Sequence, residues 1–204
     1  RPTLAAEERP CATEILTRLA TEAYRRTLTA GDVDGLMGFY DEGTARGGFE
    51  EGIRTALEAV LASPHFVLRI ERQPAGTLPG DTYRVCDQDL ASRLSFFLWG
   101  TTPDEELQTL AAAGRLSDPD VLEQQAKRML ADPRAEALGS RFAGQWFRLQ
   151  DLYKVRPDPN FFPNFGETLA DAMRRETEIF FNHLVQGNRD ALELLNADYT
   201  FVNE

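Results

Sequence analysis

Two histidines have the widest choice of chemistry in this sequence, because an imidazole can transfer a proton or bind a metal. His183 follows Glu176 by seven residues, so the two side chains share one helix face, two turns apart. A helical di-metal site uses the shorter spacing Glu-x-x-His, which is missing here. His65 follows Pro64 and could bind a haem iron held elsewhere, but a histidine at a helix end more often caps the helix. We interpret both histidines as structural polar residues and keep them as the candidate cofactor-binding residues.

The two cysteines, Cys11 and Cys86, are far apart in the chain and form neither a Cys-x-x-Cys nor a Cys-x-x-Cys-His pattern. This spacing excludes covalent attachment of a c-type haem within the chain and does not favour a zinc site. Two alternatives remain, a pair of inert buried thiols or one disulfide. Each cysteine precedes a helix expected in the core, and a bridge closing so long a loop would contribute about 4–5 kcal/mol on the chain-entropy model. Export of the protein would favour the bridge.

Arg93 is a charged residue within an apolar stretch. Its guanidinium could pair with a buried internal acid such as Glu105 or Glu106, which we favour, or reach a carboxylate of a partner. The sequence contains no Gly-rich phosphate loop, no Gly-x-Ser-x-Gly turn and no Cys/His/Asp arrangement. With two histidines, a metal site would depend mainly on carboxylates. The sequence therefore assigns no catalytic and no metal-binding residue, and it predicts that the chain is not an enzyme by itself.

These residues must be positioned by helices, of which the central one is predicted over residues 87–99. Its apolar stripe has the spacing of a buried helix face and consists of Leu90, Leu94, Phe97 and Leu98, widened by Ala91 and Trp99. The positions left for solvent or a polar partner are Ser92, Arg93 and Ser95. We expect this helix to be surrounded on nearly all sides, with Phe97 and Trp99 buried.

Further helices are predicted from apolar periodicity, capping residues and breaks at Gly and Pro. They cover residues 11–24, 33–40, 49–62, 104–113, 118–130, a segment opening at 132–133, 165–186 and 189–196. Thr29 and Asp32 form a variant capping box before the second helix, and breaks are expected at Gly43 and at Gly47-Gly48. Residues 66–71 could be a strand or a helical turn. The fold class is therefore an all-α, irregular array of about eight or nine helices with little or no strand.

Two long segments near the C-terminus carry much of the remaining apolar character. The segment opening at 132–133 has a face that is too aromatic to be exposed, through Leu138, Phe142, Trp146 and Leu149. The helix over 165–186 is expected to be buried through Leu169, Met173, Ile179, Phe180 and Leu184. Between them, residues 156–163 are predicted to form an extended aromatic loop that contains Phe161 and Phe162.

Composition excludes two further classes of protein. The net charge of −11 and the pI near 4.7 argue against a nucleic-acid-binding protein, which would need a basic stripe. No run of 18 apolar residues is present, so we expect no transmembrane segment. The chain begins with Arg1 and not Met, and we expect it to be a processed product or an excerpt.

The order of these features predicts four parts. Residues 1–9 are polar and form a leader or linker, residues 10–72 a small three-helix module, residues 73–86 a linker loop, and residues 87–204 a larger helical module. The boundary is placed in the loop because residues 73–81 hold two prolines and two glycines.

Several long stretches resemble known families. In the first module they are Leu19-Ala20, Ala23-Tyr24-Arg25-Arg26-Thr27-Leu28-Thr29, Phe49-Glu50-Glu51-Gly52-Ile53-Arg54 and Leu61-Ala62-Ser63-Pro64-His65-Phe66. In the second they are Leu90–Gly100, Pro103-Asp104, Arg128–Arg134, Phe142–Trp146, Glu176-Thr177 with Phe180-Phe181, and Ala197–Glu204. From Cys11 onward, they resemble two adjacent families of uncharacterised helical domains that accompany planctomycete-type c-type cytochromes. One departure is Thr27, where the family usually has Pro.

The resemblance implies a large exported bacterial protein, periplasmic, cell-surface or secreted, in which such modules lie among cytochrome-like segments. It places haem c elsewhere in the full-length protein, usually at a Cys-x-x-Cys-His motif after Glu204, and no cofactor in this chain. The larger module would continue beyond Glu204. The remaining segment of the same precursor, which could be a separate chain, is then the expected partner. No catalytic residue is established for these families, so none is carried over.

Three functional hypotheses follow. The first is a non-catalytic helical module that packs against a downstream redox domain of the same protein. The second is part of an oxidoreductase acting on a polymeric or surface-bound substrate, with contributions from Arg93 and the loop at Phe161-Phe162-Pro163. The third is a carbohydrate-binding module that uses the aromatic side chains of that loop, which would have to be exposed.

Overall fold

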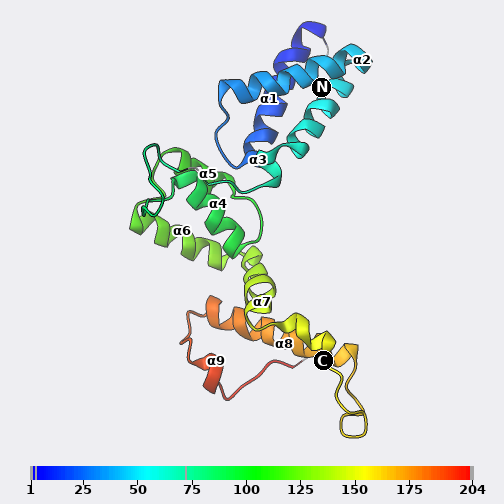
Figure 1. The fold of residues 1–204 in the computed structure, drawn as a ribbon, viewed down its shortest axis with the longest axis vertical. Coiled ribbons are helices and arrows are strands. Elements are labelled where there is room, and N and C mark those ends of the chain that lie inside the picture. The colour runs from blue at the N-terminus through cyan, green and yellow to red at the C-terminus, as the bar shows by residue number, and fades with distance from the viewer. Residues whose placement is uncertain (1, 3, 72, 203–204) are drawn as a thin grey trace. The chain divides into compact units, whose positions relative to one another are not determined.

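The computed structural model describes residues 2, 4–71 and 73–202, and helices are the regular secondary structure of these residues (Figure 1). The predicted all-α, multi-helix array is thereby confirmed. Parts of two predictions lie outside the described residues: Arg1 and Thr3 of the leader with Arg72 at the end of the first module, and Asn203 and Glu204 at the end of the resemblance. None of the described helices is both long and apolar enough to cross a membrane.

The chain folds into two compact units, each formed by two segments that are separate in the sequence. Unit 1 comprises Arg1–Arg93 and Thr102–Pro119, and unit 2 comprises Leu94–Thr101 and Asp120–Glu204. Helix α4 (Asp87–Leu98) continues across this division. The other helices of unit 1 are α1 (Ala5–Tyr24), α2 (Ala30–Ala62), α3 (Pro64–Val67) and α5 (Glu105–Ala112).

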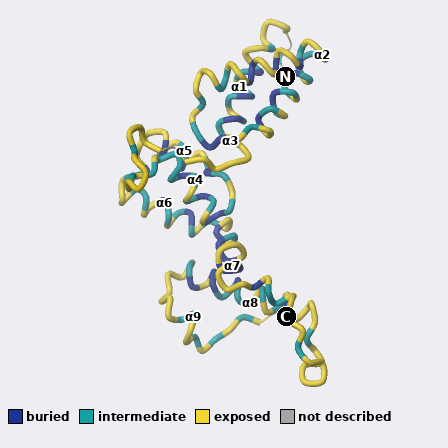
Figure 2. The backbone as a smooth tube through the Cα atoms, in the orientation of Figure 1, coloured by how far each residue is buried: buried dark blue, intermediate teal, exposed yellow. Residues whose placement is uncertain are grey.

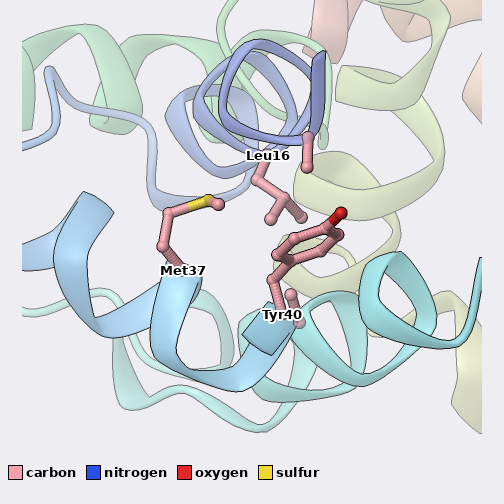
Figure 3. Packing of buried hydrophobic residues seen from close by; sticks show 5 residues of the cluster. Leu16, Met37 and Tyr40 are labelled. Carbon is pink, nitrogen blue, oxygen red and sulfur yellow. The ribbon is translucent and has the colours of Figure 1, made fainter. Parts of the chain in front are cut away.

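Helices α1 and α2 build the core of unit 1. Helix α1 begins at Ala5, inside the segment predicted as a leader or linker, and Pro10 lies near its start. Its buried side chains Ala12 and Leu16 pack against Met37 and Tyr40 of α2 (Figure 3). The predicted capping box is confirmed: the Thr29 hydroxyl accepts a hydrogen bond from the Asp32 amide at 3.2 Å, and the Asp32 carboxylate accepts one from the Thr29 amide at 2.8 Å.

Helix α2 consists of two helical arms joined at Gly47 and Gly48, whose backbone angles are not helical. The predicted break at this pair is thus confirmed, whereas the break predicted at Gly43 is wrong. Gly43 is helical and buried because the second arm passes close to it: an added Cβ would lie 2.6 Å from the Glu51 carbonyl oxygen. Gly52, on the opposite arm, leaves similar room for the Tyr40 ring, which an added Cβ would meet at 2.7 Å.

Helix α4 buries part of the predicted face, together with Ser95, which was not predicted to be buried. Ala91, Ser95, Leu98 and Trp99 are buried, whereas Phe97 is 53% exposed. Phe97 is two positions from Ser95, and two residues correspond to about 200° of helix rotation, which takes its side chain to the opposite face. The Ser95 hydroxyl is tolerated in the core because it donates a hydrogen bond to the Thr101 carbonyl oxygen at 2.8 Å. The prediction that Trp99 is buried is confirmed, and the prediction for Phe97 is wrong.

Unit 2 holds the remaining helices. They are α6 (Pro119–Ala131), the 3-10 segments η1 (Pro133–Ala135) and η3 (Leu149–Lys154), the π-helical η2 (Leu138–Ala143), α7 (Gly144–Trp146), α8 (Glu167–Gln186) and α9 (Glu193–Asn196). Figure 2 shows the alternation of buried and exposed positions along these segments.

Two predictions of burial in unit 2 are partly wrong. Leu138 and Leu149 are buried, but Phe142 and Trp146 are 39% and 58% exposed. Helix α8 turns Ala170, Glu178, Phe181, Asn182 and Leu184 inward and leaves Leu169 and Met173 exposed. The buried Glu178 carboxylate is satisfied because it accepts a hydrogen bond from Arg174 at 2.7 Å. The buried Asn182 amide is satisfied because it donates a hydrogen bond to the Glu136 carbonyl oxygen at 3.3 Å.

Candidate functional site

A cavity in unit 1 brings three of the predicted site residues together. His65, Cys86 and Arg93 line a space of about 310 Å³, together with residues 68–71, which follow α3. His65 belongs to α3, Cys86 directly precedes α4, and Arg93 lies two turns into α4. Cys11 and His183 do not line this cavity.

Arg93 forms an ion pair, but not with the predicted acids. Its guanidinium donates two hydrogen bonds to the carboxylate of Glu71, one of them at 2.5 Å, in place of Glu105 or Glu106. The pair is not buried, since the Arg93 side chain is 57% exposed. Glu71 lies in the segment 66–71 that the sequence left between strand and helical turn. Its first two residues end α3, and residues 68–71 have no regular secondary structure. The hydrogen bonds from Arg93 lower the pKa of Glu71.

Cys86 is an exposed residue, and its Sγ donates a hydrogen bond to the Asp89 carboxylate at 3.1 Å. Partial burial of the sulfur raises the pKa of the Cys86 thiol, and the bond to Asp89 adds to this effect. The thiol form, which is a weak nucleophile, is therefore favoured. Both cysteines are free thiols in the structure, so the disulfide is not formed in it. The other alternative, a pair of buried thiols, is wrong for Cys86, which is exposed, and Cys11 is half-buried.

Arg25 is a site residue that the sequence reasoning missed. It follows α1 in the left-handed conformation, with a φ of 57°, and it is buried. Its guanidinium donates hydrogen bonds to the carbonyl oxygens of Ala23, His65, Phe66 and Leu68 at 2.7–3.3 Å. One side chain thus joins the end of α1 to α3 and to Leu68, which directly follows α3. The basic pair at the end of the first predicted helix was the available signal, because a cation there can bind free carbonyl groups.

Both candidate histidines are exposed and pack against aromatic rings. The His65 ring centroid lies 5.4 Å from that of Tyr24. In unit 2, His183 lies edge-on to Tyr199 at 5.8 Å and to Phe201 at 5.3 Å. Within the described ranges, no three His, Cys, Asp or Glu side chains gather in a way that could hold a metal ion. A haem bound by one of these histidines stays a prediction.

A second feature lies in unit 2, where Phe97, Phe142, Trp146 and Phe147 form what we call the aromatic surface. Its ring centroids are 5.5 Å apart from Phe97 to Phe142 and from Phe142 to Trp146, and Trp146 stacks on Phe147 at 5.0 Å. Each of the four side chains is more than one third exposed. Two of these rings, Phe142 and Phe147, pack against the buried Phe181 of α8. Contiguous exposed aromatic rings of this kind are typical of an interaction surface.

The aromatic loop at residues 156–163 is exposed as well. Phe161 and Phe162 are 78% and 59% exposed. The exposure that the carbohydrate-binding hypothesis requires is therefore present. A hydrogen bond from the Asn160 amide to the Asp158 carboxylate at 2.8 Å shapes the turn before these rings.

Three of the polar side chains that line the cavity of unit 1 interact with other groups of the protein. Glu71 holds Arg93, the pKa of Cys86 is raised, and Arg25 is bonded to backbone carbonyls. Arg25 and Arg93 thus connect the end of α1 and helix α4 to α3 and the residues that follow it. The cavity keeps a positively charged wall, and unit 2 presents the aromatic surface.

Comparison with known proteins gives two adjacent matches. The family model described as PSD4, protein of unknown function (DUF1592), matches residues 85–204, which is more than half of the chain. The family model described as PSD5, protein of unknown function (DUF1595), matches residues 11–71. No curated protein matches the chain, and no solved structure does.

Proposed function

Because the chain belongs to the PSD4 family of proteins of unknown function (DUF1592) and also contains a PSD5 (DUF1595) segment, we propose that it is a non-catalytic module of a larger exported bacterial protein. In this proposal the module packs against a haem-containing redox domain of the same precursor, of the planctomycete-type cytochromes that the sequence resembles. The expected location is the periplasm, the cell surface or the medium. Fractionation of cells that make the full-length protein tests this location.

The aromatic surface is the observation that carries this proposal. Phe97 and Trp146 are more than half exposed, although they belong to a larger cluster of rings that rests on the core. Burying such rings against a partner would release water from both surfaces, which is the main driving force of protein association. Next to a haem, the same rings would exclude water and so raise its reduction potential.

The absorption spectrum of the full-length protein and of this chain alone tests the assignment of haem to the partner. We expect a haem band in the full-length protein and none in the chain of residues 1–204. A haem band that residues 1–204 retain by themselves would contradict the proposal.

Substitution of the aromatic surface tests the docking. In the full-length protein, Phe97→Ser with Trp146→Ser should lower the haem reduction potential by a few tens of millivolts, because water gains access to the haem. Phe161→Ser is the matched control, since Phe161 is an exposed ring outside the aromatic surface. Equal potentials in the double variant and the wild type would mean that the redox domain docks elsewhere or not at all.

A further inference from the structure

A cavity in unit 2, away from the aromatic surface, has a largely apolar wall. Its volume of about 340 Å³ falls in the range of small-molecule sites. Helix α8, η3, α9 and the residues that follow α9 surround it, and Leu149, Leu152 and Met173 belong to its apolar part. The described residues that line it include no arginine, lysine or histidine. The cavity can thus hold the hydrocarbon part of a small ligand, and its wall supplies no positive charge.

Two glutamates contribute carboxylates to this wall, and that of Glu193 is paired with a cation. It accepts a hydrogen bond from Arg189 at 2.8 Å and one from the Tyr199 hydroxyl at 2.7 Å. These hydrogen bonds lower the pKa of Glu193, so its carboxylate is ionised at neutral pH. The charge of Arg189 balances the charge of Glu193, and this pair leaves no net charge at the cavity.

The second carboxylate, that of Glu176, has no such balance. It accepts a hydrogen bond from the Thr200 hydroxyl, and it forms no ion pair with an arginine, lysine or histidine in the part of the chain that the structure describes. His183, which shares a helix face with Glu176 in the sequence, does not line the cavity. Glu176 is half-buried, and a carboxylate has about four acceptor positions, so a ligand in the cavity can reach it.

Two aromatic rings complete the wall beside these carboxylates. Phe180 and Tyr199 both line the cavity, and their ring centroids are 5.6 Å apart. The face of an aromatic ring attracts a cation, and the Arg189 guanidinium already lies 5.5 Å from the Tyr199 centroid. One unbalanced carboxylate, aromatic rings and an apolar wall are together suited to a positively charged group on a hydrocarbon body.

We propose that this cavity binds a small organic ammonium ion, whose charged nitrogen lies beside the Glu176 carboxylate and whose apolar body packs on Leu149 and Leu152. The ammonium group supplies the missing positive charge and donates charge-assisted hydrogen bonds to the carboxylate. The ligand is bound without any chemical change. This inference goes beyond the proposed function, in which the cavity has no role.

Nuclear magnetic resonance titration of the chain with benzylamine, which is protonated at neutral pH, tests this proposal. Benzylamine should shift the amide signals of Leu194 and Thr200 saturably, with a dissociation constant in the millimolar range. Benzyl alcohol, which has the same ring without the charge, should bind far more weakly. Nα-acetyl-lysine amide, which presents its ammonium group as a lysine of a partner protein would, should also bind more weakly because it lacks the compact apolar body.

Glu176→Gln should weaken the binding of benzylamine about tenfold, because the charge is lost while the amide oxygen can still accept the hydrogen bond from Thr200. The matched control is Glu167→Gln, which removes an exposed carboxylate of the same helix that does not line the cavity. This variant should bind benzylamine like the wild type. Far-ultraviolet circular dichroism should give the wild-type spectrum for both variants.

Four results would overturn the proposal. They are the absence of saturable shifts with benzylamine, equal binding of benzyl alcohol, tighter binding of the lysine derivative, and the same loss of affinity in both variants. Tighter binding of the lysine derivative would mean that the cavity takes a side chain of a protein. The same loss in both variants would mean that the amine responds to net charge alone. None of these readouts involves the haem-containing partner, so they are independent of the proposed function.

Discussion

Asp32 combines two interactions that are usually found on separate residues. Its carboxylate caps the start of α2 by accepting a hydrogen bond from the Thr29 amide. It also accepts hydrogen bonds from both terminal nitrogens of Arg26. The two side chains are largely buried, with 16% of Asp32 and 11% of Arg26 exposed. The hydrogen bonds from Arg26 hold the pKa of the Asp32 carboxyl group well below its usual range, although burial opposes this shift.

The stabilisation by Asp32 should therefore depend on pH. The pKa of the carboxyl group is lowered in the folded state, so its contribution is complete above the ordinary aspartate pKa of about 3.9 and is lost as the pH falls towards the folded-state value. We expect Asp32→Asn to lower the free energy of unfolding by about 1–3 kcal/mol at neutral pH. Urea unfolding at neutral pH and again well below the ordinary aspartate pKa measures this difference, which should shrink in acid.

The control for this prediction is Asp34→Asn, which changes an exposed carboxylate in the same turn of α2. It should shift the free energy of unfolding by no more than about 0.5 kcal/mol at either pH. A difference between Asp32→Asn and the wild type that stayed constant with pH would contradict the role of the ionised carboxylate.

Residues whose partners are close in sequence could be predicted, and those with distant partners could not. The Thr29–Asp32 capping box spans four residues and follows from residue types alone. Arg93 was expected to be paired, but its acid, Glu71, lies 22 residues away in a segment without helical periodicity. Arg25 reaches carbonyl groups 40 to 43 residues further on, and such interactions depend on how α3 packs.

At the scale of the element, two glycines of α2 look alike in the sequence but have different surroundings in the structure. Gly52 lies where the two arms approach, whereas Gly35 has open space where a side chain would begin. Gly52→Ala should lower the free energy of unfolding by about 1–3 kcal/mol, because the buried Tyr40 ring occupies the place of the methyl group. Thermal or urea unfolding measures the change.

Gly35→Ala is the matched substitution in the same helix. It should raise the free energy of unfolding by about 0.4–1 kcal/mol, since it reduces the entropy of the unfolded chain and meets no neighbour. If both alanine variants changed stability in the same direction, the two arms of α2 would not approach each other closely at Gly52.

The sequence predicted the existence of most helices better than the faces that they bury. Helix boundaries depend on neighbouring residue types, so the sequence could predict them directly. Examples are the break at Gly47-Gly48 and the helix starts at Thr29 and Asp118-Pro119. In α4, the predicted apolar stripe included Phe97, which is exposed, and left out Ser95, which is buried. Small residues allow close packing and a serine can donate to a nearby carbonyl oxygen, and neither property appears in a hydrophobic pattern.

At the scale of the whole molecule, the state of the two cysteines is a prediction that a count of free thiols can test. The structure predicts two titratable thiols per chain, with Cys86 reacting before the half-buried Cys11. The reaction of Cys86 should be slow at neutral pH and accelerate in base, because the thiolate is the reactive form and the pKa is raised. A colorimetric thiol reagent measures both the count and the rate.

Cys86→Ser should remove the faster phase of that reaction, and Cys11→Ser the slower one. A chain purified without reductant that showed no free thiol until it was reduced would instead support the Cys11–Cys86 disulfide. That outcome would also agree with the exported location in the proposed function.

The two tryptophans of unit 2 have opposite surroundings, and this has an optical consequence. Trp99 is 3% exposed, donates its indole N–H to the Met129 carbonyl oxygen at 2.8 Å and lies under the Arg134 guanidinium. Trp146, in contrast, is 58% exposed. An indole in water emits at longer wavelength than one in a protein core and is open to collisional quenchers such as iodide. Fluorescence of the unlabelled protein thus follows the interior of unit 2 through one residue and its aromatic surface through the other.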